Sequence, residues 1–365
     1  MSFDRIIGQK RAKEILQRAV QHNRVAHAYL FSGPEGVGKE ALAIEFARAL
    51  FCQTEGEKPC GQCSSCRRVG SFSHPDFIYI FPMPKSATVD EEKAIQESLI
   101  AEPYARKKLW AAPIISIDRV RQLRHISTMR PLEGRRVVVI AEADQMTVEA
   151  ANSLLKILEE PPDSMHLILT TSRPSALLPT ILSRCQEIRL GLLSDADIER
   201  ELIERKGMSV DNAKLISRIA QGSYRRALEW VDEDLETQRE YVLNILRTAF
   251  KDSLTQMELI EELNKVFDKR GIKEILSLVL LWLRDALVLW NEPNGTGNTH
   301  QQIVNIDRLE TLKKFVSAFE SIDFDQAFIE IEKSIERINR NVQLNLILIV
   351  LFLTLRKVLK IKGER

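Results

Sequence analysis

Residues 33–40 read Gly33-Pro34-Glu35-Gly36-Val37-Gly38-Lys39-Glu40, and this stretch decides the fold of the chain. It follows the apolar run Ala28–Phe31 and precedes a second apolar run, Ala41–Ile44, which gives the order strand, glycine-rich loop, helix. In that order the loop N–H groups and the helix N-terminus hold an anionic phosphate, and a lysine adds positive charge. The stretch therefore predicts an α/β domain with a phosphate-binding loop. Its candidate contact residues are Gly33, Gly36, Val37, Gly38 and Lys39.

Both usual protein contacts to magnesium are missing from this loop. The last loop residue should be Ser or Thr, whose hydroxyl ligates Mg²⁺, but it is Glu40. A strand expected at Val137–Ala141 should end in an aspartate for the same ion, and it ends in Ala141. Glu40 also places negative charge beside any phosphate, which weakens triphosphate binding. We therefore expect no Mg²⁺ and no hydrolysis, and leave ATP binding open. The alternative is an unusual site in which a carboxylate ligates the metal directly.

Strand and helix patterns alternate up to residue 187, which predicts a parallel sheet. The expected strands are Ala28–Ser32, Asp76–Ile80, Val137–Ala141, Leu167–Thr171 and Glu187–Leu190. The expected helices there are Ile6–Val20, Glu40–Leu50 and Thr147–Leu158. A polar, irregular insert at Pro82–Pro113 is expected to be a loop with helical pieces. From Ser194 onward we expect helices and no strand. Three domains are therefore predicted: a P-loop domain at 1–187, a small helical domain at 188–234 and an all-α domain at 235–365.

The bulk composition is that of an ordinary globular protein, with 44% apolar and 28% charged residues. A net charge of +1 is too small to attract nucleic acid to the chain as a whole, so any DNA contact is expected to be local or shared with partners. The N-terminus lacks the apolar core of a signal peptide. The most apolar stretch, 344–355, is shorter than the ~20 residues that span a membrane. We expect a cytoplasmic protein without a membrane segment.

Four of the five cysteines lie close together in the sequence, at Cys52, Cys60, Cys63 and Cys66. The last three form two overlapping Cys-x-x-Cys units, and Cys52 lies a short loop upstream, so four thiolates can surround one ion. Soft thiolates in a cytosolic chain favour Zn²⁺. Because no coordination position is left open, the zinc of this knuckle (52–66) is predicted to be structural. The alternatives are small buried residues, adventitious disulfides, or His74 in place of one thiol.

Longer stretches resemble the clamp-loader ATPase family of bacterial DNA polymerase III. They are Ile7–Gln9, Ala26–Phe31, the four-cysteine knuckle, Ala151–Pro162, Leu178–Cys185 and Gly222–Arg225. The resemblance implies an AAA+ P-loop domain, a small helical lid and a helical collar, the last by fold class only. Within the family, Glu40 and Ala141 look most like the delta-prime subunits, which do not hydrolyse ATP. The gamma and tau motor subunits would carry Thr and Asp at these two positions.

The resemblance also implies roles for single residues. Ser183-Arg184-Cys185 is similar to the family motif whose arginine reaches the nucleotide of a neighbouring subunit, a task suited to the permanent charge and bidentate fork of a guanidinium. Without that motif, Arg184 would be interpreted as a solvated or salt-bridged surface residue. Arg225 resembles a sensor that faces the chain's own loop, and the alternative is a helix-opening turn with a solvated arginine. Thr171 takes the position of a second sensor, and Glu142 that of the water-activating carboxylate.

These features imply a non-hydrolysing assembly subunit that contributes Arg184 in trans. Its partners would be gamma/tau-like and delta-like subunits, and the complex would place the sliding clamp on primed DNA. One alternative is an active motor with variant metal ligands, against which Glu40 and Ala141 argue. Another is a zinc-bearing DNA-binding module, which the neutral charge disfavours although Arg67 and Arg68 adjoin Cys66.

Overall fold

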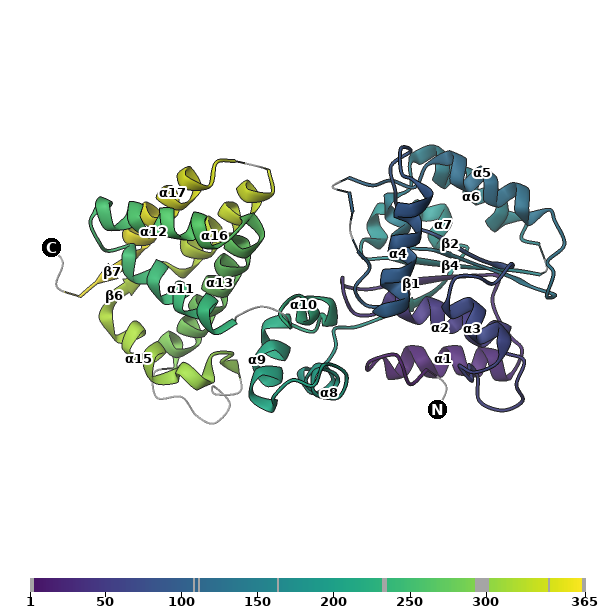
Figure 1. Cartoon of the computed structure of the whole chain (residues 1–365), viewed down its shortest axis with the longest axis horizontal. Coiled ribbons are helices and arrows are strands. Elements are labelled where there is room, and N and C mark those ends of the chain that lie inside the picture. The colour runs from purple at the N-terminus through teal and green to yellow at the C-terminus, as the bar shows by residue number, and fades with distance from the viewer. Residues whose placement is uncertain are drawn as a thin grey trace. The chain divides into compact units, whose positions relative to one another are not determined.

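The computed structural model describes residues 3–107, 109–110, 112–162, 164–231, 235–292, 302–340 and 342–362. They fall into two compact units, Met1–Val231 and Asp232–Arg365 (Figure 1). The predicted small helical domain lies in the first unit. Its separation from the P-loop domain at residue 187 stays a prediction.

The first unit is built on a sheet of five parallel strands in the order β2-β3-β4-β1-β5. The strands are β1 (Ala28–Ser32), β2 (Phe77–Ile80), β3 (Arg136–Ile140), β4 (Met165–Thr171) and β5 (Gln186–Arg189). Every residue of β1 and β3 is buried, as expected for strands covered on both faces. Ser32 pairs in register with Thr171, and Ile140 with Leu169, so these strands end at one edge of the sheet. The predicted parallel α/β fold is therefore confirmed.

Helices cover both faces of this sheet: α5 and α6 lie on one, and α2 on the other (Figure 1). The helices of the unit are α1 (Lys10–Gln21), α2 (Lys39–Phe51), α3 (Ser64–Gly70), α4 (Val89–Ala101), α5 (Ile117–Ser127), α6 (Val148–Glu159), α7 (Pro179–Leu182), α8 (Asp195–Lys206), α9 (Val210–Ala220) and α10 (Tyr224–Glu229). Short 3₁₀ turns lie at Ala143–Gln145 and Pro174–Ala176. The first expected helix starts late, at Lys10, and the insert expected at Pro82–Pro113 contains one long helix, α4, which a capping box at Thr88 and Glu91 begins.

The second unit is helical, as expected. Its helices are α11 (Leu235–Thr248), α12 (Ser253–Val266), α13 (Lys269–Asn291), α15 (Leu309–Ala318), α16 (Phe324–Asn339) and α17 (Leu344–Val358). The expectation of no strand after Ser194 was wrong at one place, where β6 (Phe319–Ile322) pairs antiparallel with β7 (Leu359–Ile361). Each strand has three or four residues and follows directly on a helix, so no alternation marks it in the sequence. In the described part of the chain, no helix is long and apolar enough to cross a membrane.

A buried carboxylate organises the second unit. Asp285 on α13 is fully buried and accepts hydrogen bonds from the backbone N–H of Val304 (3.0 Å) and of Asn305 (2.8 Å). The Asn305 side chain donates a third bond at 2.8 Å and accepts one from Arg239 on α11, whose guanidinium also pairs with Asp307. The carboxylate therefore fastens residues 304–305 to α13 and, through Asn305, to α11.

Replacing this carboxylate should destabilise the second unit. Asp285→Ala leaves three buried N–H donors without their acceptor, which should lower the free energy of unfolding by about 3 kcal/mol. Asp325→Ala, at an exposed position on α16, is the control and should change it by less than about 0.5 kcal/mol. Urea unfolding followed by circular dichroism measures both. Equal midpoints for the two variants would contradict the structural role of Asp285.

Candidate functional site

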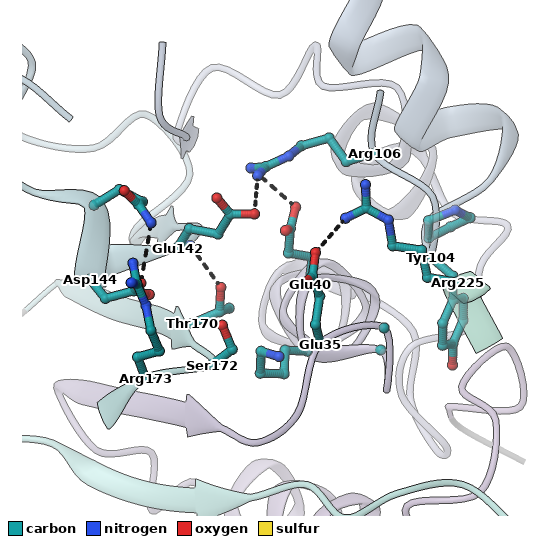
Figure 2. Close-up of a pocket in the computed structure, with 15 residues that line it drawn as sticks. Glu35, Glu40, Tyr104, Arg106, Glu142, Asp144, Thr170, Ser172, Arg173 and Arg225 are labelled. Carbon is teal, nitrogen blue, oxygen red and sulfur yellow. Dashed lines mark hydrogen bonds and ion pairs between the residues drawn. The ribbon is translucent and has the colours of Figure 1, made fainter. Parts of the chain in front are cut away.

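A cavity of about 350 Å³ lies at the edge of the sheet where β1, β3 and β4 end (Figure 2). It is lined by the phosphate loop and the start of α2, the ends of β3 and β4, the segment after α4, and the start of α10. The lining residues are Glu35, Gly36, Gly38, Lys39, Glu40, Pro103, Tyr104, Arg106, Glu142, Asp144, Gln145, Thr170, Ser172, Arg173 and Arg225. The volume is near the lower end of the range of about 300–1,000 Å³ for ligand pockets. Six predicted residues share this lining, namely Gly36, Gly38, Lys39, Glu40, Glu142 and Arg225.

The phosphate loop folds as predicted but closes on itself. Gly38 has φ 95° and begins α2, a left-handed conformation that suits glycine. The Lys39 ammonium donates to the carbonyl oxygens of Gly33 at 2.8 Å and Pro34 at 2.5 Å. Burial lowers the pKa of this ammonium, and neighbouring carboxylates oppose that shift. The loop lysine is therefore held by the loop's own carbonyls. The predicted Gly33 and Val37 belong to the same loop but do not line the cavity.

Arg106 joins the two carboxylates that stand at the expected metal position. Its Nη2 donates to Glu142 Oε1 at 2.5 Å, and its Nη1 lies 3.6 Å from Glu40 Oε2, an ion-pair distance (Figure 2). The Tyr79 hydroxyl on β2 also donates to Glu40 Oε2. Both carboxylates are thus engaged by groups of the protein, and neither is arranged as an open ligand for Mg²⁺. The residues present do not fit a magnesium site of the usual kind.

The Arg106 guanidinium is buried and fixed. Only 8% of the residue is exposed, and its Cζ lies 5.7 Å from the centre of the Phe81 ring. Burial alone would lower the pKa of this guanidinium, but Glu40, Tyr79 and Glu142 outweigh burial, so the pKa is raised. Sequence reasoning missed Arg106 and Tyr79. Nothing in the irregular insert marked one arginine as the partner of Glu40, because the pairing depends on how the segment after α4 returns to the loop.

The predicted sensor residues have separate partners. Arg225 at the start of α10 lies 3.1 Å from Glu35 Oε1, which ties the lid helix to the loop (Figure 2). Thr171 donates to Asp144 Oδ1 at 2.7 Å and does not line the cavity. Arg173 pairs with the same carboxylate at 2.9 Å. Two residues directly after β4, Ser172 and Arg173, line the cavity, and Arg173 was missed from the sequence.

The predicted trans arginine lies outside the cavity of its own chain. Arg184 follows α7, and its Nη1 donates to the Thr180 carbonyl at 3.0 Å while its Nη2 lies 3.1 Å from Glu159 Oε1 at the end of α6. About a third of the side chain is exposed, at 35%. Ser183 precedes it and is exposed at the surface of the same turn, whereas burial raises the pKa of the Cys185 thiol to about 11. Cys185 packs against the core of the sheet, as predicted.

The four predicted cysteines converge. The Sγ atoms of Cys52, Cys60, Cys63 and Cys66 all lie within 4.8 Å of one another. Four thiolates around one Zn²⁺ at about 2.3 Å are about 3.8 Å apart, so this set can hold the ion. Backbone N–H groups already point at the sulfurs, from Cys60 to Cys52 (3.4 Å), from Cys63 to Cys60 (3.3 Å) and from Cys66 to Cys63 (3.5 Å). Such bonds favour thiolates over thiols.

His74 takes no part in this cluster. Its Nε2 lies 3.0 Å from Glu133 Oε2, and its ring stacks on Phe51 at 4.0 Å between centroids. The interpretation of His74 as part of the turn before β2 is therefore confirmed, and the alternative in which it replaces a thiol was wrong. Arg68 on α3 also pairs with Glu133, so this carboxylate links the helix of the knuckle to the loop before β3.

Comparison with known proteins bears directly on this loop, cavity and knuckle. The family model described as DNA polymerase III, delta subunit matches residues 8–194, which is half of the chain and includes the loop, the knuckle and every cavity-lining residue except Arg225. The chain belongs to the DNA polymerase III clamp-loader family. The expected α/β fold of the first unit and the resemblance to delta-prime subunits are therefore confirmed.

Curated relatives come from two classes of clamp-loader subunit. The delta' subunit of Haemophilus influenzae is 30% identical over 77% of this chain and 76% of its own length. The delta' subunit of Bacillus subtilis is 34% identical over 58% of this chain and 56% of its own length. The gamma/tau subunit of Mycobacterium tuberculosis is 32% identical over 72% of this chain and 42% of its own length. The chain thus spans about half the length of the last two relatives. Identity to both classes is similar, so identity alone does not separate a motor from a non-hydrolysing subunit.

Proposed function

We propose that this clamp-loader subunit is non-hydrolysing, of the delta-prime type, and supplies Arg184 to the nucleotide site of a neighbouring ATPase subunit. One observation carries the proposal. The metal position of the phosphate loop has Glu40 in place of a hydroxyl and Ala141 in place of an aspartate, and Arg106 occupies the space between Glu40 and Glu142. A phosphoryl transfer that depends on a positioned metal has no place for that metal here.

The partners follow from the family. We infer that the chain assembles in the cytoplasm with gamma/tau-like and delta-like subunits, and that the complex loads the sliding clamp onto primed DNA. The second, helical unit would serve as the oligomerisation collar. Contact with the clamp and the DNA would come through the complex, in keeping with a net charge of +1 on this chain.

The environment of Arg184 supports a role outside its own chain. The guanidinium lies on the turn after α7, held by Thr180 and Glu159 and away from the cavity lined by Arg106 and Arg225. A partly exposed ion pair such as Arg184–Glu159 contributes about 0–1 kcal/mol to stability, so Arg184 can leave Glu159 at little cost and bind a phosphate of a neighbouring subunit. The fork of an arginine then binds phosphate oxygens in a bidentate way.

Nucleotide binding to the full chain tests the proposal. We expect isothermal titration with ATP to give no saturable, magnesium-dependent heat, because Glu40 repels the phosphates and Arg106 occupies the metal position. A gamma/tau-like subunit from the same organism is the positive control. ATP binding that requires Mg²⁺, or hydrolysis by the isolated chain, would contradict the proposal and restore the active-motor alternative.

A further inference from the structure

The segment that follows α4 crosses the nucleotide cavity from one side to the other. It runs from Glu102 to Arg106, and Pro103, Tyr104 and Arg106 all line the cavity (Figure 2). Glu102 Oε2 pairs with Lys206 of α8 at 2.9 Å, which fastens the start of the segment to the helical lid. Its last residue reaches Glu40 and Glu142 on the opposite side. The segment therefore contacts the helical lid, the start of α2 and the end of β3.

Tyr104 forms an aromatic part of the cavity wall. The residue is 5% exposed, its hydroxyl accepts the backbone N–H of Ile7 at 2.7 Å, and its ring packs edge-to-face on Tyr224 of α10 at 5.2 Å. A Cβ added to Gly38 would lie 2.5 Å from the ring carbon Cε1, so the ring rests directly on the phosphate loop. One aromatic side chain thus bridges the N-terminal segment, the loop and the lid.

The helical lid also contacts the phosphate loop directly, through Arg225. The Arg225 guanidinium pairs with Glu35, and its backbone N–H donates to the Gly36 carbonyl at 3.4 Å. A Cβ on Gly36 would lie 2.0 Å from Ser223 Oγ, which shows how near the lid helix comes to the loop.

We propose that the segment 102–106 is a built-in occupant of the nucleotide site, in which the Arg106 guanidinium takes the place of the metal between Glu40 and Glu142, and the Tyr104 ring holds loop and lid together without nucleotide. The inference rests on the proposed function and deepens it, since it names the residues that exclude ATP. Glu40 and Glu142 are partly buried, with 19% and 27% of their side chains exposed, and their like charges repel each other, so a fixed cation between them is strongly favoured. Arg106 supplies it permanently, and a divalent ion would have to displace it.

Removal of the guanidinium tests the charge half of the proposal. In the full chain, Arg106→Ala removes the positive charge that pairs with Glu40 and Glu142, and we expect Tm to fall by about 6 °C or more. Because paired carboxylates are ligands for hard cations, millimolar Mn²⁺ or Mg²⁺ should recover part of that loss, and Mn²⁺ binding should become visible by electron paramagnetic resonance. The wild-type chain should show neither response. Arg119→Ala, which removes a half-buried arginine paired with Glu92, is the matched control and should leave the chain without a metal response.

A double variant separates charge neutralisation from simple packing. Glu40→Gln combined with Arg106→Ala removes one stranded carboxylate, so it should melt above Arg106→Ala and lose the metal response. If the single variant does not fold, the double variant carries the test, because the proposal requires it to be the more stable of the two. A double variant no more stable than the single one, or an Arg106→Ala chain that melts like wild type and binds no Mn²⁺, overturns the proposal.

Hydrogen exchange tests the lid half. Amides of Tyr224–Glu229 should be as well protected in the free wild-type chain as with ATP and Mg²⁺ added, and Tyr104→Ala should raise their exchange at least tenfold. Unchanged exchange in Tyr104→Ala overturns this half. Failure of any of these tests leaves the role of Arg184 untouched, whereas hydrolysis by the wild-type chain would refute the proposed function itself.

Discussion

Arg184→Ala should abolish ATP hydrolysis at the one site that this chain faces in the assembled clamp loader. An arginine supplied in trans stabilises the charge that develops during phosphoryl transfer, and such residues accelerate the reaction ~10³-fold or more. The chain itself should fold unchanged, because Arg184 is a partly exposed residue whose side chain contacts only the nearby Thr180, Ser183 and Glu159 in the described part of the chain. The loss should therefore lie in the rate of hydrolysis and leave assembly intact.

The measurement is DNA-stimulated ATPase of the loader reconstituted from this chain with gamma/tau-like and delta-like subunits, and single-turnover hydrolysis isolates the affected site. Arg184→Lys keeps the charge but loses the bidentate fork, so it should recover little of the rate. Arg189→Ala is the matched control, since Arg189 is an exposed arginine on β5 paired with Glu187. Size-exclusion chromatography verifies that each complex forms. A complete complex with Arg184→Ala and a normal single-turnover rate would refute the trans role.

The fold was predictable where short-range pattern determines structure. Ala28–Ser32 was expected as a strand and is β1 with the same bounds, because an apolar run followed by a glycine loop leaves little choice. The loop, α2 and the cysteine knuckle follow in the same way, since each depends on residues within about thirty positions of one another. The pairing of Glu40 with Arg106 does not, because it joins α2 to an irregular segment that follows another helix.

The same contrast explains the candidate site. The sequence identified the missing magnesium contacts at Glu40 and Ala141, since a motif specifies which residue type should stand at each position. The sequence did not indicate which residue would neutralise Glu40. Arg106 lies in an irregular segment, where no pattern distinguishes a buried arginine from a solvated one. Arg106 is 8% exposed, and only the structure reveals that figure. The position of Thr171 at the end of a strand was predictable from the sequence, but the hydrogen bond that its hydroxyl donates to Asp144 was not.

Loss of zinc should have the second-largest effect, on stability. We expect purified protein to hold about one Zn²⁺ per chain. Binding of a structural zinc is worth about 10–16 kcal/mol where the whole domain depends on it. In this chain only the knuckle depends on the metal. Cys52 directly follows α2, and Cys66 is fully buried with its Sγ 3.7 Å from the Arg48 carbonyl oxygen, so contacts with the rest of the unit also hold these two cysteines in place. Cys60 and Cys63 are less buried and depend more on the metal.

Chelation at neutral pH, or Cys63→Ser, should therefore unfold the knuckle and lower the free energy of unfolding by several kcal/mol while the sheet persists. The link from Arg68 and His74 to Glu133 should weaken with it, so exchange should also rise in the loop before β3. Elemental analysis gives the zinc content, thermal melting the stability, and hydrogen exchange the extent of unfolding. Cys185→Ala is the control cysteine and should keep its zinc, because Cys185 lies outside the cluster. Zinc-free protein that melts like untreated protein would mean that the four cysteines are only small packing residues, since a structural metal cannot be removed without loss of the fold that it holds.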